Sequence, residues 1–215
     1  MFLYGCNGRE NVLTIIFCSS IAAKHDYIKF VDAHTIEVQS FQAYGSDFIK
    51  KAGFSPDAYV QMAMQLATYR LWGKQAGTYE ATQVRVFLHG RTETTRSVSP
   101  ASAAFCEMMG LTPKNDEHDE SIRKKKLELL NEAVMANVKY IGRAAQGLGV
   151  DRHLLGLSMC AKEGESLPAL YSDPTFIRAK RWRVSTSNLT HPIFVNWGYG
   201  EVVPDGLGLS YSVHP

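Results

Sequence analysis

The side chains with the richest chemistry gather in residues 78–97, TYEATQVRVFLHGRTETTRS. A phenol and a carboxyl, Tyr79 and Glu80, open this stretch, and a run of hydroxyls and charges at 91–96 closes it. Such groups lose hydration on a core face, so the run predicts a binding loop that follows a strand at 83–86, where apolar and polar residues alternate. A solvated, well-capped turn is the alternative.

Arg152 is a second candidate because of its position in the chain. Gly147 and Gly149 interrupt the preceding helical pattern, and Asp151 is expected to be the N-cap of a new helix. Arg152 would then lie in the first turn, where a cation gains nothing from the helix dipole. A guanidinium there is better explained by a carboxylate, which it binds through two parallel hydrogen bonds. That carboxylate belongs either to a ligand or to the protein itself.

Two lysines, Lys50 and Lys51, precede an expected helix start. Ser55 followed by Pro56 is typical of an N-cap and a first helical position, and Asp57 suits the positive end of the helix dipole. Exposed N–H groups and fixed positive charge together favour an anion, so this segment is a candidate anion site. A solvated lysine pair is the alternative.

The elements that must position these groups alternate between helices and strands, which predicts a mixed α/β fold. Helices are expected at 56–72, 100–109, 121–146 and from 151 onward, and strands at 35–41, 83–86, 181–184 and 207–211. The apolar stripe of the first helix is expected to be Tyr59, Ala63, Leu66 and Ala67. That of the long helix is expected to be Leu127, Leu130, Val134 and Ile141.

Composition limits the possible classes of protein. A chain of 215 residues suits one large domain or two small ones, and 45% hydrophobic residues exclude a mainly disordered protein. A net charge of +2 is too small to indicate nucleic acid or an anionic membrane as partner. The four cysteines form no C-x-x-C pair, which favours free thiols in a reducing compartment over disulfides or a metal site. The apolar run at 12–23 is far too short to span a bilayer and favours the end of a helix, with a signal peptide as the alternative.

The 78–97 string resembles the carnitine/choline acyltransferase family, most closely its carnitine O-acetyltransferase branch. Further blocks that match the family lie before it at 48–73 and after it at 149–157, 185–187 and 199–211, all in the family's order. The resemblance covers roughly residues 20–211 and implies a chloramphenicol-acetyltransferase-like mixed β-sheet with helices packed on it. It also implies that 20–215 is a C-terminal domain truncated at both ends, with residues 1–19 unassigned.

The resemblance implies acyl transfer between a short-chain acyl-CoA, acetyl-CoA above all, and carnitine. Coenzyme A is then a co-substrate, and no permanent cofactor or metal is expected. The implied carnitine contacts are Tyr79, Thr92 and Arg152, and the implied coenzyme A contacts are Lys50, Lys51, Ser55, Pro56, Asp57 and Asn188. Ser185 and Ser187 are implied at the reacting centre, where Ser187 would stabilise the oxyanion and orient carnitine. Trp197 and Tyr199 would close a short acyl pocket.

The resemblance also exposes departures. Ser46 and Val138 stand where relatives can have basic residues that help to hold coenzyme A. The family's general base is a histidine in an H-S-x-x-D-G-like segment, and none of the seven histidines lies in such a segment. His153, beside Arg152, is expected to pack in the core.

Three functions therefore remain open. The chain is part of a carnitine acetyltransferase without its base, a non-catalytic module that binds coenzyme A and carnitine, or part of a choline acetyltransferase. Arg152 and Thr92 argue against the last, because choline has no carboxylate. The complete enzyme is expected to be a monomer inside the cell, with the mitochondrion, the peroxisome and the cytoplasm all open.

Overall fold

The computed structural model describes residues 8–111, 119–162, 164–194 and 196–215. The chain divides into two compact units, residues 1–42 and 43–215. The first unit contains helix α1 (Gly8–Asp32), so the apolar run at 12–23 is helical but lies within the helix rather than at its end. Among the described residues, no helix combines the length and apolarity that crossing a bilayer requires.

The strand expected at 35–41 is wrong, because these residues have no regular secondary structure. Ile36 and Val38, the alternating apolar residues that suggested it, are 87% and 77% exposed. Alternation favours a strand only where a neighbouring strand provides hydrogen bonds and a covered face. No strand of the described residues pairs with this segment.

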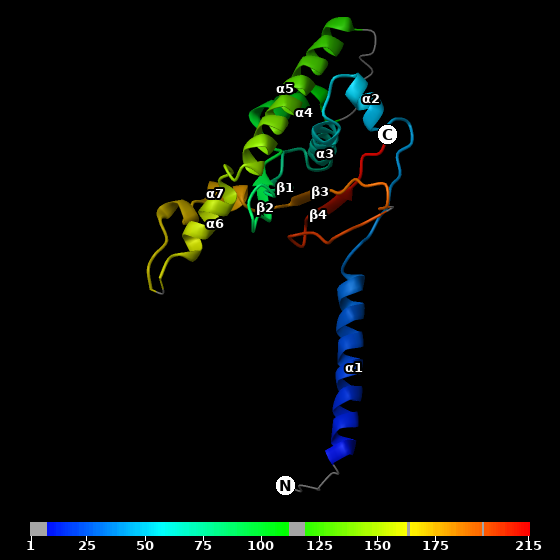
Figure 1. Cartoon of the computed structure of the whole chain (residues 1–215), viewed down its shortest axis with the longest axis vertical. Coiled ribbons are helices and arrows are strands. Elements are labelled where there is room, and N and C mark those ends of the chain that lie inside the picture. The colour runs from blue at the N-terminus through cyan, green and yellow to red at the C-terminus, as the bar shows by residue number, and fades with distance from the viewer. Residues whose placement is uncertain (1–7, 112–118, 163, 195) are drawn as a thin grey trace. The chain divides into compact units, whose positions relative to one another are not determined.

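The second unit is a mixed α/β structure, which confirms the expected fold class (Figure 1). Its helices are α2 (Ser46–Lys51), α3 (Pro56–Trp72), α4 (Pro100–Met109), α5 (Glu120–Ala145), α6 (Asp151–Met159), the 3-10 turn η1 (Ala169–Ser172) and α7 (Pro174–Ala179). Its strands are β1 (Thr78–Gln83), β2 (Thr92–Thr95), β3 (Val184–Asn188) and β4 (Leu207–Tyr211).

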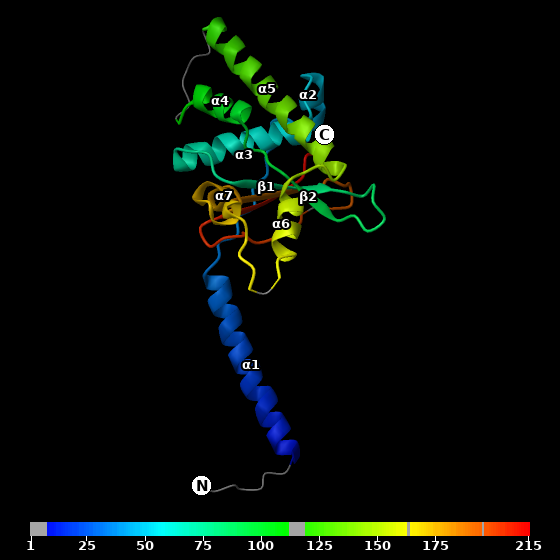
Figure 2. The same cartoon turned by 90° about the vertical axis from the view of Figure 1, so that its left-hand side faces the viewer.

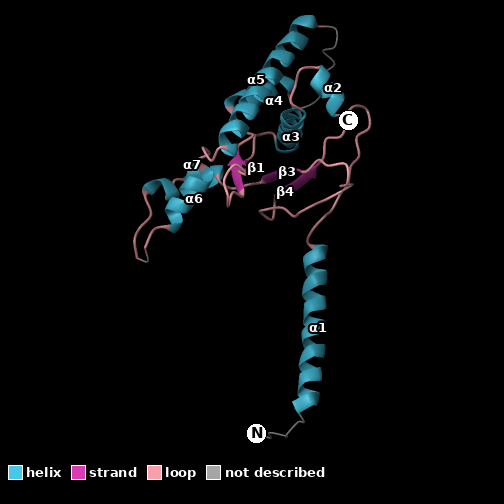
Figure 3. Ribbon diagram, in the orientation of Figure 1, coloured by secondary structure: helices cyan, strands magenta, loops and turns pink. Residues whose placement is uncertain are grey.

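The four strands form one sheet in the order β2-β1-β3-β4. Strand β1 is antiparallel to β2 and parallel to β3, and β3 is parallel to β4. Helices α3 and α5 cover one face of this sheet, and α4 packs against both of them (Figures 2 and 3). Helix α6 packs against the edge strand β2.

The local signals at helix ends are largely confirmed. Helix α3 begins at Pro56 and ends at Gly73, whose φ of +68° is the left-handed conformation that glycine adopts without strain. Ser99 and Ser102 form a capping box at the start of α4. Ser55 occupies the N-cap position of α3, but its side chain makes no capping hydrogen bond.

The buried face of α3 differs from the predicted apolar stripe. Ala63 and Ala67 are exposed, and the buried residues of this helix are Ala58, Gln61, Met62, Gln65 and Thr68. In α5, Leu127 is likewise exposed, whereas Val134 is buried as expected. The apolar core lies between helices, where Ala58 and Met62 pack against Phe105, Cys106, Ala133 and Val134. Helix α3 turns its glutamines toward the sheet instead.

The sheet meets α3 through polar groups that donate hydrogen bonds to one another. Gln65 Nε2 donates to Thr78 Oγ1 at 3.0 Å, and Gln61 Nε2 donates to Thr186 Oγ1 at 2.9 Å. Within the sheet, Thr82 and Thr95 hydroxyls lie 2.7 Å apart. These pairs give buried donors and acceptors the partners that water would otherwise supply.

Two predictions about this region are wrong. Strand β1 is Thr78–Gln83, so of the predicted strand at 83–86 only Gln83 is in a strand, and the inward residues of β1 are two threonines and a glutamate rather than apolar residues. The predicted binding loop at 91–96 contains strand β2, and Glu93, Thr94 and Thr95 are at most 4% exposed. Burial of hydroxyls and carboxyls is tolerated here because most of them are hydrogen-bonded.

Glu80 is the buried carboxyl at the centre of this interior. Its Oε2 accepts hydrogen bonds from Ser97 Oγ and from Asn137 Nδ2, both at 3.0 Å. Burial, then the nearby negative charge of Asp57, raises the pKa of Glu80 to about 8, against the opposing effect of these two hydrogen bonds. Glu80 is therefore neutral in the folded protein over a range where an exposed glutamate is ionised.

Replacing Glu80 with glutamine should change how stability depends on pH. The folded protein keeps a proton that the unfolded chain releases above about pH 4.5, so the free energy of unfolding should fall as pH rises from about 4.5 to about 8. Glu80→Gln mimics the neutral acid and should remove that part of the fall. Urea unfolding of both proteins across this interval measures it. A wild-type curve no steeper than that of the variant would contradict the prediction.

Candidate functional site

A cavity of about 320 Å³ lies where β1, β3 and the segment before β4 meet. It is lined by Tyr79, Ser185, Thr186, Ser187, Trp197, Tyr199 and Val202. The parallel register places Tyr79 opposite Ser185 on the neighbouring strand. The cavity therefore contains one residue of the expected carnitine set, both expected serines and both expected acyl-pocket aromatics.

The three hydroxyls of 185–187 lie within strand β3, not in a loop that follows it. The predicted strand at 181–184 is thus displaced, since the described strand begins at Val184. Ser185 and Ser187 share one face of the strand because side chains alternate, and Thr186 points the other way. Thr186 Oγ1 donates to the Tyr79 carbonyl at 3.0 Å and is fully buried. Ser185 and Ser187 therefore lie on a strand that the Thr186 hydrogen bonds anchor on its opposite face.

The structure brings together Tyr79, Thr92 and Arg152, the three residues that the resemblance implied as carnitine contacts. Arg152 Nη2 donates to the Tyr79 phenol oxygen at 3.3 Å, and Arg152 Nε donates to the backbone carbonyl of Thr92 at 3.2 Å. The Arg152 guanidinium carbon lies 5.8 Å from the centre of the Tyr79 ring. Thr92 thus contacts the guanidinium through its backbone, and Tyr79 is the residue of the three that lines the cavity.

The Arg152 guanidinium has neutral acceptors where the sequence indicated a carboxylate. Among residues 8–111, 119–162, 164–194 and 196–215, no Asp or Glu forms an ion pair with it. The side chain is exposed, so its remaining donors face solvent. Because the protein's own carboxylates do not neutralise it, the guanidinium can bind an external anion.

The expected N-cap role of Asp151 is wrong. Val150 occupies the N-cap position of α6, and Asp151 is the first helical residue. The Asp151 carboxylate instead forms an ion pair with Arg96. The backbone N–H of Arg152 donates to Glu93 Oε1 at 3.3 Å, so Glu93 of strand β2 supplies the acceptor that caps the start of α6.

Trp197 and Tyr199 form a stacked aromatic wall. Their ring centres lie 5.7 Å apart with an interplanar angle of 27°. The Trp197 carbonyl accepts a hydrogen bond from Ser210 Oγ at 2.8 Å, which ties the wall to β4. Burial raises the pKa of Tyr199, against a hydrogen bond with Ser185 that lowers it, so the phenol stays neutral. The wall is thus a bulky, uncharged boundary of the cavity.

The expected coenzyme A contacts fall into two groups. Asn188 Nδ2 donates to Asp57 Oδ1 at 2.7 Å, although these residues are 131 positions apart in the chain. Ser55 and Pro56 begin α3 beside Asp57. Lys50 and Lys51 form the exposed last turn of α2, where the negative end of the helix dipole already favours cations. That position explains the lysines without an anion.

No histidine is among the residues that line the cavity. His153 is exposed, so its expected place in the core is wrong, and His118 lies outside the described residues. Within the described part of the chain, no group of His, Cys, Asp or Glu side chains could hold a metal ion. The described cysteines, Cys18, Cys106 and Cys160, are free thiols.

Several residues of the site were missed from the sequence. Val202 lines the cavity, and Trp182 contacts the Tyr79 ring at a centre distance of 5.8 Å. Gln61 holds Thr186 from behind. The spacing of Gln61 and Gln65, one turn apart on the same helix, could have indicated a polar buried face.

Comparisons with known proteins identify the family to which the chain is similar. A family model described as Choline/Carnitine o-acyltransferase matches residues 18–215. The chain is 38% identical over 206 residues to "Carnitine O-acetyltransferase" of Homo sapiens, an alignment covering 95% of this chain and 32% of the relative. It is 36% identical over 194 residues to "Carnitine O-acetyltransferase, mitochondrial" of Saccharomyces cerevisiae, covering 90% and 28%.

A relative with a different name is nearly as similar. "Choline O-acetyltransferase" of Sus scrofa is 35% identical over 201 residues, covering 93% of this chain and 30% of the relative. The chain therefore spans about three-tenths of the length of the relatives it matches. Overall identity separates the two kinds of relative by too little to decide between them.

Replacing Thr186 with valine should weaken the fold at the site. The change removes the donor to the Tyr79 carbonyl and the acceptor for Gln61, and should lower the free energy of unfolding by about 1–3 kcal/mol. Thr175→Val, on the exposed face of α7, is the matched control and should change it by about 0.5 kcal/mol or less. Chemical unfolding compares the two variants, and equal losses would contradict the role of Thr186.

Proposed function

The chain belongs to the choline/carnitine O-acyltransferase family, and from that premise we propose that it provides the carnitine- and coenzyme A-binding part of a carnitine O-acetyltransferase. The proposed reaction moves a short acyl group reversibly between the thiol of coenzyme A and the hydroxyl of carnitine. Coenzyme A and carnitine are both substrates in it, so neither is a resident cofactor.

The observation that supports carnitine most is the unneutralised Arg152 guanidinium. It lies against Tyr79, a residue of the cavity, and its hydrogen-bond acceptors are a phenol and a backbone carbonyl. A carboxylate would bind it better than either, because charge-assisted hydrogen bonds are about twice as strong as neutral ones. Carnitine carries a carboxylate and choline does not, so Arg152 favours carnitine.

Ser187 is proposed to stabilise the oxyanion that forms when the carnitine oxygen attacks the thioester carbonyl. A hydroxyl donor held by a rigid strand costs little reorganisation when charge develops on that oxygen. Ser185 shares the same strand face and is proposed to support the same centre. In the family, the proton of the attacking hydroxyl goes to a histidine in an H-S-x-x-D-G-like segment, and we propose that such a segment completes the site.

Coenzyme A is proposed to lie along α2 and the start of α3. Lys50 and Lys51 would meet its phosphates, and residues 55–57 with Asn188 would face its adenine end. The contact between Asn188 and Asp57 supports a shared location for the two. Ser46 in place of a family lysine should make this binding weaker than in relatives that have the lysine.

Two other functions are the alternatives. A non-catalytic module would bind both ligands without transfer, and a choline acetyltransferase would bind choline as well as carnitine. Because the yeast relative is named as a mitochondrial protein, the mitochondrion is one candidate compartment, beside the peroxisome and the cytoplasm.

Binding to L-carnitine and to choline tests the assignment directly. The wild-type chain should bind carnitine more tightly than choline, since only carnitine offers a partner for Arg152. Arg152→Gln should weaken carnitine binding about 10- to 100-fold, the loss expected for one or two charge-assisted hydrogen bonds, and should leave choline unaffected. Isothermal titration calorimetry measures all four pairs. Equal affinity of the wild type for choline and carnitine would support choline acetyltransferase instead.

Acyl transfer is tested by adding the part of a relative that should carry the histidine base. The chain, joined to the part of the human relative that precedes the matched region, should release free thiol from acetyl-CoA only when carnitine is present. The same fusion with Arg152→Gln is the control. A correctly folded fusion that binds both substrates but releases no thiol would favour the non-catalytic module.

Trp197→Gly should lengthen the accepted acyl chain. Removing the indole opens the aromatic wall of the cavity, so the same fusion should shift its preference toward longer acyl-CoAs. Rates with a series of acyl-CoAs measure the shift, and Trp72→Gly, outside the cavity lining, is the control. An unchanged chain-length profile would refute the acyl-pocket assignment.

A further inference from the structure

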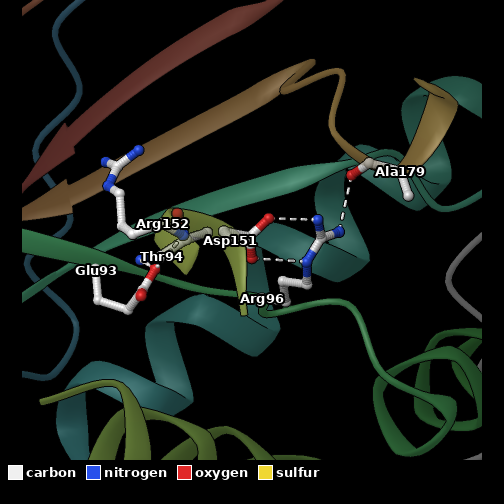
Figure 4. Close-up of polar contacts among 6 residues, drawn as sticks. All are labelled: Glu93, Thr94, Arg96, Asp151, Arg152 and Ala179. Atoms are coloured by element: carbon white, nitrogen blue, oxygen red, sulfur yellow. Dashed lines mark hydrogen bonds and ion pairs between the residues drawn. The ribbon is translucent and has the colours of Figure 1, made fainter. Parts of the chain in front are cut away.

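We propose that the Arg96–Asp151 ion pair and the buried Glu93 carboxylate act together to aim the Arg152 guanidinium. All three would then be positioning residues for carboxylate recognition. The recognition of a carboxylate rests on the proposed function, whereas the orientation of Arg152 is a property of the fold alone. Figure 4 shows the contacts that join these residues.

The ion pair fixes the first residue of α6. Arg96 Nε donates to Asp151 Oδ2 at 3.0 Å and Arg96 Nη2 donates to Asp151 Oδ1 at 2.6 Å, a two-point contact that allows little rotation. The side chains are 25% and 11% exposed, so solvent screens the pair only weakly. Arg96 Nη1 also donates to the Ala179 carbonyl at 2.8 Å, which attaches the end of α7 to the same point.

Glu93 fixes the next residue from the other side. It is 4% exposed, and its Oε1 accepts from the backbone N–H of Thr94 at 2.6 Å and from that of Arg152 at 3.3 Å. Val150, at the N-cap, has no side-chain acceptor, so Glu93 takes that role from strand β2. Gly149 leaves the room, because a Cβ there would lie 2.4 Å from Glu93 Cγ.

The helix start is thus held by two carboxylates at its positive end. Residue 151 is fixed through its side chain and residue 152 through its backbone, so the direction of the Arg152 Cα–Cβ bond is set before any ligand arrives. The exposed guanidinium then needs only the weak contacts with Tyr79 and Thr92 to stay in place.

A second connection runs through Trp182. The Arg96 guanidinium carbon lies 4.7 Å from the centre of the Trp182 ring, and the same ring contacts Tyr79. The ion pair therefore supports both members of the Arg152–Tyr79 contact. Holding an arginine in its binding conformation removes the entropy that it would otherwise lose when an anion binds.

Arg96 and Arg152 differ in their hydrogen-bond acceptors, and this difference separates a structural role from a ligand-binding role. Arg96 has a carboxylate partner and is partly buried, whereas Arg152 has neutral partners and is exposed. A pair that served stability alone would affect the unfolding of the whole domain. A positioning pair must in addition change the order of the Arg152 side chain and the affinity for an anion.

Asp151→Asn in the full chain is the test. It keeps the size of the side chain but removes the charge, and Asp151→Glu restores the charge. Glu128→Gln is the matched control, because it removes a carboxylate that pairs with Lys125 on the exposed surface of α5. The readouts are the Arg152 Nε–H resonance in NMR, amide hydrogen exchange across α6, and calorimetric titration with L-carnitine and with coenzyme A.

Asp151→Asn should broaden or shift the Arg152 resonance, speed exchange in the first turn of α6, and weaken carnitine binding about three- to tenfold, the cost of ordering one long side chain. Coenzyme A affinity should stay unchanged, and Asp151→Glu should recover most of the loss. Glu128→Gln should leave all these readouts as in the wild type.

Two results would overturn the inference. One is an Arg152 resonance and α6 exchange that Asp151→Asn leaves unaltered, and the other is a loosened Arg152 with unaltered carnitine affinity. Should the wild type fail to bind carnitine while Asp151→Asn still loosens Arg152, the proposed function fails and the aiming device is supported. If Asp151→Asn does not fold, Arg96→Lys, which keeps the charge but loses the two-point geometry, takes its place under the same criteria.

Discussion

The interior between α3, α5 and the sheet is built from polar side chains that hydrogen-bond to one another. Gln61 shows the constraint most clearly, because its amide donates to Thr186 on β3 and to Tyr211 on β4 and accepts from Ser97 after β2. A single buried amide thus connects one helix to three segments of the sheet region. Leaving such a donor without a partner costs about 1–3 kcal/mol, so these elements fit together in one arrangement.

The hydrogen bonds on the helix-covered face of the sheet also restrict the residues on its opposite face, where the cavity lies. Thr186 is held by Gln61 on the helix side, and it holds the backbone of Tyr79 across the neighbouring strand. The flanking serines of β3 therefore face the cavity from a backbone that cannot easily shift. A site that stabilises a developing charge needs this kind of rigidity, because a donor that must reorient gives much of its benefit back.

The carboxyl groups around β1, β2 and α6 are each neutralised or hydrogen-bonded by other parts of the protein. Glu80 is kept neutral by burial, Asp151 is neutralised by Arg96, and Glu93 is used by backbone N–H groups at the start of α6. Arg152 is left with neutral acceptors. A guanidinium that pairs with no carboxylate of the described residues is suited to an external anion. Under the proposed function, the packing of α6 would therefore bear on the choice between carnitine and choline.

The sequence by itself determined what depends on neighbouring residues. Pro56 and Gly73 bound α3, Ser99 caps α4, and the motif blocks carry the family assignment, since each of these signals is local in the chain. The resemblance carried by these blocks also implied Tyr79, Thr92 and Arg152 as one set of ligand contacts. Only the tertiary structure decided that Thr92–Thr95 is a buried strand, that α3 turns Gln61 rather than Ala63 inward, and that Asp151 pairs with Arg96 instead of capping its helix. Each of these outcomes depends on a hydrogen-bond partner far away in the chain, and a polar residue can be buried or exposed until that partner is in place.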